Sequence, residues 1–473
     1  MIIAEKTELD PQLIKIALIM LLGMFTPALD ATVVNVAIKT IGVELHSSIS
    51  AVQWITTAYI LAMGIAVPIS GWLVNRFSGK NVYLISLAFF GAGSIGAALS
   101  WNIGSLIVFR IVQGAGAGIM LPVMQTMIVR YAGGAKLPSL MSIIGIPAAI
   151  IPILGPTIGG LIINYLPWRW VFVINIPICI AAIILGIVKL PPTDAMNRRQ
   201  PLDPIGLLLL TPAFCALIFG ISMLSNDGEI HSAILLLAVG ISLMIIYCVY
   251  ALKEKKEPPL NIRLFQYRNF SSSIAMIFLY GIISTGTLFV LPLFFQQAHQ
   301  TTAFVAGLLL APQGIGMLCA RSLSAKYTEQ YGARPVLCAG IIGTVVGTLP
   351  LALFHMADMI PIIAILFVRG AGLGLMMVPA MVAVYEGMDA KSVAQGTTAT
   401  RIFQQIGGAF GTAILAILLS HGLADVGTTK IASAFDGVFW CSTGITILLF
   451  IPAMFLNKKN APNQIIVEPG NEI

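Results

Sequence analysis

The sequence predicts an all-α polytopic membrane protein. Of its 473 residues, 58% are hydrophobic and 10% are charged, whereas soluble domains contain about 25% charged residues. Apolar runs of roughly 20 residues, the length that crosses a ~30 Å hydrocarbon core, recur along the whole chain. Basic residues gather in alternate gaps between these runs, as membrane topology requires. Together these observations exclude a soluble enzyme that carries a single anchor.

Fourteen candidate spans follow one another along the chain. They begin near residues 13, 51, 82, 103, 138, 170, 204, 231, 270, 303, 335, 359, 397 and 435. The first apolar run is too long for the core of a signal peptide, so we expect it to stay in the protein as the first span. Because the number of spans is even, both termini lie on the same side of the membrane.

The basic residues indicate which side that is. With cytoplasmic termini, 21 of the 26 Lys and Arg residues fall in inner loops and tails. Only Lys39, Arg169 and Lys430 fall outside, while Arg110 and Arg369 lie within spans. This distribution predicts cytoplasmic termini. It also accounts for the net charge of +7 through topology, so we expect no nucleic-acid partner.

Six cysteines stand in or beside the apolar runs, and none forms a CxxC pair. Thiols in such surroundings usually pack as small apolar side chains. We therefore expect no disulfide framework, no metal site and no cofactor.

The chain repeats itself at a spacing of about 256 residues. GAGAGIM at residues 114–120 matches GAGLGLM at residues 370–376, and an arginine precedes each copy, at Arg110 and Arg369. The fourth span thus matches the twelfth in the same orientation. Parallel halves related by an axis along the membrane normal are a transporter architecture. Glycine-rich packing of unrelated helices is the alternative explanation.

The repeat divides the chain into three parts. Residues 1–190 form an N-terminal six-span bundle, and residues 263–473 form a C-terminal six-span bundle with a tail. Residues 191–262 carry two inserted spans and their linkers.

Asp30 is the one acidic residue inside a long apolar run. The other 18 of the 19 Asp and Glu residues fall in tails or short polar gaps. A carboxylate at membrane depth costs roughly 2.5–3.5 kcal/mol on insertion scales and normally faces a cavity or a partner. Arg110 is the best candidate partner, because a rise of 1.5 Å per residue places both in the outer half of their spans. A motion that changed their separation or hydration would move the carboxyl between protonated and ionised forms. The alternative role is an ion pair that fixes helix register.

Six stretches of the sequence carry recognisable signatures. They are LDATVVNVAI from Leu29, QWITTAYILA from Gln53, GWLVNRFSGK from Gly71, RIVQGAGAG from Arg110, GIPAAIIPILGPTIGG from Gly145 and WRWVFVINIP from Trp168. Together they resemble the major facilitator superfamily, in particular its fourteen-span drug:proton antiporters, over almost the whole chain. The resemblance implies the major facilitator fold, with two six-helix bundles and two inserted helices.

Two of these stretches, with the second arginine of the repeat, are expected to serve the conformational change. The residues concerned are Gly71, Asn75, Arg76, Lys80, Gly145, Gly155, Pro156, Gly159, Gly160 and Arg369. The glycines of the fifth span remove side chains from one helix face and permit close helix contact, although ordinary packing would need the same glycines. Asn75 stands where the family usually has an aspartate, so the charge network of that loop is incomplete here.

The resemblance also implies a substrate cavity built by both halves. Polar residues in apolar surroundings are the candidates to line it, because buried amides and hydroxyls seek partners. They are Asn35, Gln53, Tyr59, Gln113, Gln296 and Gln405. Each could instead bridge two helices.

The residues alone predict an ion-coupled transporter. The resemblance implies a proton-coupled exporter (antiporter) of small amphipathic or cationic compounds, working by alternating access in the bacterial cytoplasmic (inner) membrane, with multidrug efflux and antibiotic resistance as its role. Its partners would be the substrate, protons and the lipid bilayer, and some members also work with a periplasmic adaptor and an outer-membrane channel.

Other functions remain open at this point. Family members also export metabolites, siderophores and lipids, and a channel or non-transporting receptor is the alternative from another class. An enzyme or ATP-driven pump is not expected, because the sequence contains no GxxxxGK[ST], HExxH or GxSxG motif.

Overall fold

The computed structural model describes residues 11–456, apart from residues 48, 133–136, 145, 194, 199–200, 225–229, 254–257, 302, 354–358, 389–391 and 427–430. All secondary structure in these ranges is helical. The first group of helices is α1 (Pro11–Glu44), α2 (Ile49–Arg76), α3 (Gly79–Ala98), α4 (Ile103–Ala132), α5 (Leu137–Ile144), α6 (Ile146–Tyr165), α7 (Trp170–Val173) and α8 (Asn175–Lys189). An inserted pair, α9 (Pro204–Met223) and α10 (Ile230–Lys253), precedes a short 3-10 helix, η2 (Ile262–Gln266). The last group is α11 (Arg268–Gln297), α12 (Ala303–Leu309), α13 (Ala311–Tyr331), α14 (Ala333–Leu353), α15 (Met359–Tyr385), α16 (Val393–Val426), α17 (Ile431–Ala434), α18 (Asp436–Leu448) and α19 (Phe450–Met454).

Thirteen segments of the described chain are long and apolar enough to cross a membrane. The predicted fifth span falls on α5 and α6, between which residue 145 lies outside the described residues. The fourteen-span count and the cytoplasmic termini therefore stay predictions. Helices α1 and α16 have 34 residues each, about 50 Å at 1.5 Å per residue, and so exceed the ~30 Å core of a bilayer.

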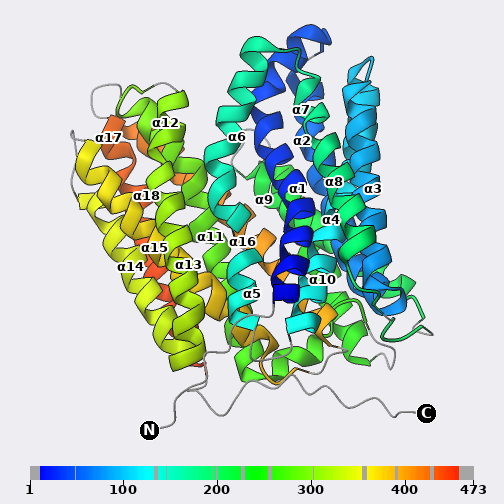
Figure 1. The fold of residues 1–473 in the computed structure, drawn as a ribbon. Coiled ribbons are helices and arrows are strands. Elements are labelled where there is room, and N and C mark those ends of the chain that lie inside the picture. The colour runs from blue at the N-terminus through cyan, green and yellow to red at the C-terminus, as the bar shows by residue number, and fades with distance from the viewer. Residues whose placement is uncertain are drawn as a thin grey trace.

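Two sets of helices pack by the same scheme (Figure 1). In the N-terminal half (α1–α8), α2 and α3 both pack on α4, α1 packs on α6, and α3 packs on α8. In the C-terminal half (α11–α19), α13 and α14 pack on α15, α11 packs on α16, and α14 packs on α18. Helix α9 contacts both α2 and α16, while α10 packs on α9. The division at residues 190 and 262 agrees with this packing and stays a prediction.

Glycines at equivalent helix crossings show the repeat in three dimensions. A Cβ atom on Gly114 would lie 2.3 Å from the carbonyl oxygen of Tyr59, and one on Gly370 would lie 2.0 Å from that of Gln313. Since neither position tolerates a side chain, α4 touches the backbone of α2 just as α15 touches that of α13. The repeated glycines thus bring equivalent backbones together, which chance similarity would not require.

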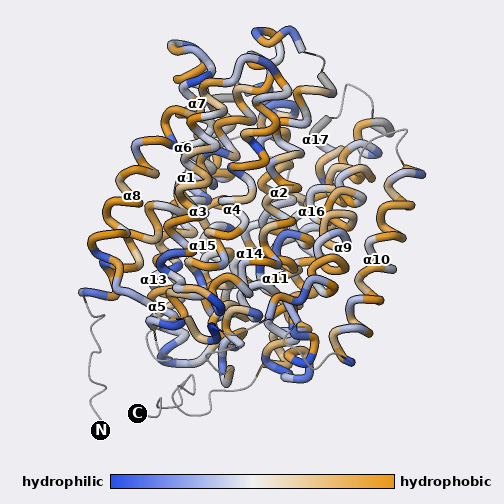
Figure 2. Tube along the Cα trace, turned by 90° about the vertical axis from the view of Figure 1, so that its right-hand side faces the viewer, coloured by the Kyte–Doolittle hydropathy of each residue, from blue (hydrophilic) through white to orange (hydrophobic). Residues whose placement is uncertain are grey.

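Lipid contact accounts for the outer surface of the bundle. Hydrophobic residues cover the outward side of α8, and hydrophilic residues gather at the ends of the bundle (Figure 2). Ile184, Ile187 and Val188 of α8 are exposed large apolar side chains, which water would disfavour and hydrocarbon would not.

The two halves meet where α4 ends and α16 begins, at the inner (cytoplasmic) side in the predicted topology. The Gln125 amide of α4 donates to the Tyr385 hydroxyl of α15 at 3.0 Å. Ser139 of α5 donates to the Glu329 carboxylate of α13 at 2.7 Å. Gly71 packs against the start of α16. These contacts hold the inner ends of the two halves together in this conformation.

Candidate coupling site

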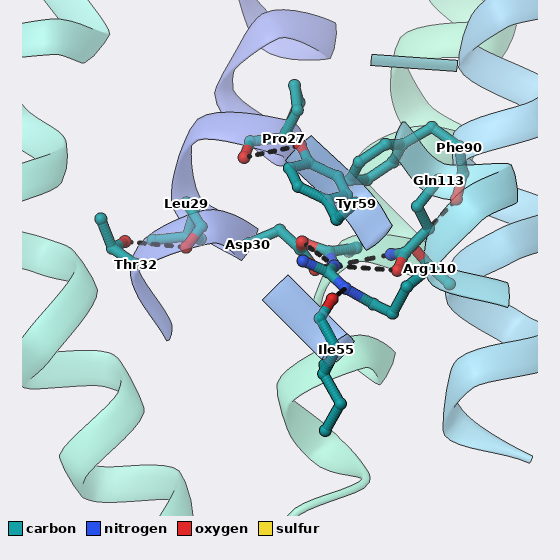
Figure 3. A network of polar contacts seen from close by, with 11 residues as sticks. Pro27, Leu29, Asp30, Thr32, Ile55, Tyr59, Phe90, Arg110 and Gln113 are labelled. Carbon is teal, nitrogen blue, oxygen red and sulfur yellow. Dashed lines mark hydrogen bonds and ion pairs between the residues drawn. The ribbon is translucent and has the colours of Figure 1, made fainter. Parts of the chain in front are cut away.

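Asp30 lies near the middle of α1 and is 1% exposed, and Arg110 of α4 is fully buried. The Nη1 atom of Arg110 donates to Oδ2 of Asp30, forming a salt bridge (Figure 3). The structure thus brings together the acid and the base that the sequence pairs by depth. Both charges are removed from solvent, so each depends on the other for stability.

Neutral donors complete the surroundings of the Asp30 carboxylate. The Asn175 amide of α8 donates to Oδ1 at 2.8 Å, and the Gln113 amide of α4 reaches the same oxygen at 3.5 Å. Gln113 in turn donates to the Ser94 hydroxyl of α3 at 2.7 Å. Sequence reasoning missed Asn175 and Ser94 as site residues. Asn175 lies within the WRWVFVINIP stretch, where a lone amide among apolar residues was the available signal.

The guanidinium of Arg110 is held by α2 as well as by α1. Its Nε donates to the carbonyl oxygen of Ile55 at 3.1 Å, and its Nη1 donates to Oε1 of Gln113 at 3.0 Å (Figure 3). The ring of Tyr59 lies 4.1 Å from the guanidinium carbon, a cation–π contact. Nη2 has no hydrogen-bond partner among the described residues. Helices α1, α2, α3, α4 and α8 therefore converge on one charge pair.

The backbone of α1 is adapted on the approach to Asp30. Pro27 lies inside the helix and has no N–H to donate to the carbonyl of Gly23. The hydroxyl of Thr26 donates to that carbonyl instead, at 2.6 Å. The Tyr59 hydroxyl donates to the carbonyl of Pro27 at 3.4 Å. These bonds satisfy backbone groups that would otherwise lack partners in the membrane.

The residues expected to line a substrate cavity lie in separate parts of the structure. Tyr59 and Gln113 are both buried in the polar cluster around Asp30 in this conformation. Gln296 is half-buried and donates to the carbonyl of Pro292 on its own helix at 3.2 Å. Gln405 is half-buried on α16.

Four expected site residues, or their side chains, lie outside the part of the chain that the structure describes. Residue Gly145 is outside the described residues, as are the side chains of Asn35, Gln53 and Pro156. Their roles stay predictions.

The loop between α2 and α3 ties neighbouring elements of the N-terminal half. Oδ1 of Asn75 accepts a hydrogen bond from Nη2 of Arg130 at 2.6 Å. Nζ of Lys80 donates to the carbonyls of Ile187 and Leu190, at 2.8 and 2.7 Å, at the end of α8.

Arg76 lies in the same region, with its guanidinium carbon 5.6 Å from the ring centre of Trp72. Asn75 thus keeps a link between α2 and α4 without the charge of the usual aspartate.

The fifth-span glycines differ in what they contact. A Cβ on Gly155 would lie 2.1 Å from the Thr32 hydroxyl oxygen, and one on Gly159 would lie 3.1 Å from Cβ of Val36. Both glycines therefore permit the close approach of α6 to α1. A Cβ on Gly160 would meet no described atom within 4 Å, so the expected close packing does not extend to this residue.

Arg369 occupies the place of Gln113 in the second half. Arg369 immediately precedes Gly370, as Gln113 immediately precedes Gly114. The sequence-based match with Arg110 is therefore displaced by one helical turn, since Arg110 stands four residues before Gly114.

Neutral oxygens hold the Arg369 guanidinium. Its Nε donates to the hydroxyl of Thr348 at 3.2 Å, its Nη1 donates to the amide oxygen of Gln313 at 2.5 Å, and its Nη2 donates to the hydroxyl of Thr287. No carboxylate of the described chain contacts it. The C-terminal half thus carries a buried cation where the N-terminal half carries a neutral amide.

Two helical halves, many apolar spans and an intramembrane charge pair define a polytopic membrane transporter. The model of the Major Facilitator Superfamily matches residues 20–412. The chain belongs to this superfamily and is a multi-pass protein of the bacterial inner membrane.

Similar proteins include transporters of drug-resistance type. The chain is 30% identical to a multidrug resistance protein B homolog of Mycobacterium tuberculosis, over 97% of this chain and 92% of that protein. It is 29% identical to the lincomycin resistance protein LmrB of Bacillus subtilis, over 90% of this chain and 88% of that protein. Their drug-resistance names are consistent with the drug:proton antiporter group of the superfamily.

Solved structures share the fold at low sequence identity. The human organic anion transporter MFSD10 matches with a TM-score of 0.66 and 14% identity, over 95% of this chain and 100% of that chain. The proton:xylose symporter XylE matches with a TM-score of 0.65 and 14% identity, over 96% of this chain and 98% of that chain.

Proposed function

We propose that the protein is a proton-coupled exporter of small amphipathic compounds that works by alternating access as a multidrug antiporter. The observation that carries this proposal is the buried Asp30–Arg110 pair. Asp30 is the one acid of the described residues that lies away from the helix ends. It is therefore the candidate to take up and release the proton.

Protonation of Asp30 would change the forces between the helices. A neutral carboxyl no longer attracts the Arg110 guanidinium, although it still accepts from Asn175 and donates to a neighbouring oxygen. Removing one charge of a buried pair costs about 3–5 kcal/mol, which exceeds the 1.4 kcal/mol of a tenfold change in an equilibrium. The proton would thus alter the packing of five helices at once, which is what coupling to a conformational change requires.

The direction of transport and the breadth of substrates rest on the drug-resistance relatives. Nothing in the described residues favours a channel or a receptor over a carrier. The periplasmic adaptor and outer-membrane channel stay predictions of the family resemblance.

Transport in proteoliposomes tests the proposal. A pH gradient across the bilayer should drive a fluorescent amphipathic dye against its concentration gradient in the wild type. Asp30→Asn should abolish this gradient-driven movement while dye-for-dye exchange persists, because exchange needs no net proton transfer. Asp203→Asn is the matched control, since Asp203 is buried but caps α9 through the Gly206 N–H, a task that asparagine performs equally well. Gradient-driven transport by Asp30→Asn at the wild-type rate would refute the coupling role.

A further inference from the structure

Arg321 of α13 differs from the other buried arginines. Its side chain is 3% exposed, and its one hydrogen bond within the described part of the chain is a long contact of 3.9 Å from Nη2 to Sδ of Met317. Its Nε is buried and has no partner among the described residues. Arg110 and Arg369, by contrast, each donate to three or more oxygen contacts. The fold gives each of those two guanidiniums several oxygen acceptors and leaves that of Arg321 without one among the described residues.

An unpaired guanidinium at membrane depth is costly. A buried charge without a partner loses its hydration and gains no Coulomb attraction in return, at a cost of several kcal/mol. A thioether sulfur is only a weak acceptor and compensates little. Ionisable residues kept within spans at such a cost commonly mark substrate or ion pathways. The described residues thus leave the Arg321 guanidinium available to an acceptor that arrives during the working cycle.

The position of Arg321 fits an acceptor that arrives between the halves. It lies 10 residues before the inner end of α13 at Tyr331, about 15 Å along the helix. Helix α13 packs against α5 and α6 of the opposite half. At 3.6 residues per turn, Arg321 lies about 80° around α13 from Glu329, the residue that bonds to α5. Separation of the inner ends would uncover the face of α13 that carries Glu329, and Arg321 lies within about a quarter turn of that face.

A second cation, Arg401 of α16, stands at a similar depth from the inner side. Arg401 lies 8 residues after the inner start of α16 at Val393, about 12 Å along the helix. Helix α16 packs against α2 and α4 of the opposite half. Arg401 has one hydrogen bond, to the amide oxygen of Gln404 at 3.4 Å, and its Nε has no partner in the described chain.

The balance of charge in the interior indicates the sign of the charge on the ligand. Asp30 is neutralised by Arg110, whereas Arg321, Arg369 and Arg401 contact no carboxylate of the described chain. The C-terminal half therefore presents a positive interior, which attracts anions and repels cations.

We propose that the substrate carries an anionic group, a carboxylate or phosphate, and that the guanidinium of Arg321 binds it. Guanidinium matches the two oxygens of such a group with parallel N–H donors. The amphipathic remainder of the substrate would lie against the apolar seam between the halves. This inference rests on the proposed export function and narrows its substrate class, so the cationic compounds expected from the family resemblance would be poor substrates.

Two rhodamine dyes that differ only in a free or a methyl-esterified carboxyl provide the probes. Wild-type proteoliposomes should move the free-carboxyl dye at least about tenfold faster than the ester, since a charge-assisted hydrogen bond is worth roughly 1.5–3 kcal/mol. Arg321→Gln should remove this preference, and Arg321→Lys, which keeps the charge, should retain part of it. Arg263→Gln is the matched control, because Arg263 is exposed on the linker before α11 and its loss should leave the preference unchanged.

Thermal unfolding in detergent separates a ligand site from a structural role. Arg321→Gln should unfold at the same or a higher temperature than the wild type, because it removes an unpaired buried charge. The free-carboxyl dye should raise the unfolding temperature of the wild type and not that of Arg321→Gln. A wild-type preference for the ester, or an unchanged preference in Arg321→Gln, would overturn the inference.

A failure of the underlying export function would look different. Neither dye would then follow the pH gradient in the wild type, whatever residue stood at position 321.

Discussion

A double-mutant cycle on Asp30 and Arg110 can separate the two roles of their salt bridge, coupling and helix register. The variants are Asp30→Asn, Arg110→Gln and the double variant. Each single change leaves one uncompensated charge that is 1% or less exposed, and breaking a buried pair in this way costs about 3–5 kcal/mol. The double variant removes both charges and keeps two amides that can hydrogen-bond to each other. Its stability should return to within about 1 kcal/mol of the wild type.

The expected coupling energy between the two positions follows from these values. If each single variant loses at least about 3 kcal/mol and the double variant loses about 1, the interaction energy is roughly 5 kcal/mol, far above the 0.5 kcal/mol of independent sites. Denaturant unfolding of the purified protein in detergent measures the stabilities. Proton-coupled dye transport in proteoliposomes measures the activity of the same samples.

The two measurements should diverge in the double variant. Stability should recover, while gradient-driven transport should stay absent, because no carboxyl remains to carry the proton. If the double variant regained transport, the pair would be a structural ion pair that fixes register and another group would carry the proton. Additive losses of stability would show that the two side chains do not interact in the membrane.

Three further predictions test other parts of the structure. Gly155→Leu should lower stability by about 1–3 kcal/mol through overpacking against α1 and should slow transport. Gly160→Leu, at a position with open space, should change neither quantity. Thermal unfolding measures the stability, and transport rates measure the activity. Asn75→Asp should raise the free energy of unfolding by about 1 kcal/mol, because a charge-assisted bond to Arg130 is stronger than the neutral one, and the gain should vanish when Arg130 is replaced by Gln. Burial raises the pKa of Glu386, just beyond the end of α15. The protonated Glu386 carboxyl therefore contributes stability below its unfolded pKa, and this contribution is lost as the pH rises through its folded pKa. In denaturant titrations, Glu386→Gln should be more stable than the wild type near about pH 7 and no different below about pH 4. A constant difference across that range would contradict the assignment to Glu386.

The helices could be predicted from hydropathy and charge, because both can be read from each residue without knowing its neighbours in the fold. The observed helix starts agree closely with the predicted ones, as with Trp170 and Pro204, which begin α7 and α9 at the expected residues. Asp30 and Arg110 could be paired from the sequence because unpaired charges are expensive in a bilayer and their depths match. For the spans and for the charge pair alike, the free-energy cost of any other placement in the membrane is large, so few other arrangements are possible.

The uncharged members of the site could not be found in the same way. Asn175 and Ser94 are inexpensive to bury when any donor or acceptor is near, so their presence in a span indicates no particular partner. Their contacts depend on how α8 and α3 are rotated about their axes, which hydropathy does not determine. The arginines that precede the two glycine motifs do not stand at equivalent positions. Arg110 stands four residues before Gly114 and Arg369 one residue before Gly370, a difference of about one helical turn.

This displacement of one turn gives the two halves different electrostatics on the same scaffold. At the position of Asp30 the second half has Thr287, the residue that accepts from Arg369 as Asp30 accepts from Gln113. The N-terminal half thus combines an acid with a base. Ionised Asp30 neutralises Arg110, and the charge of this half rises by one when Asp30 takes up a proton. Among the described residues at membrane depth, the C-terminal half has arginines and no carboxylate, and this charge is fixed because arginine does not release its proton in proteins. A fixed positive charge suits recognition of an anionic ligand, whereas a titrating pair suits coupling. If both proposals hold, the charge moved per cycle would depend on the charge of the substrate, because the proton is exchanged at Asp30 while the arginines of the C-terminal half stay charged.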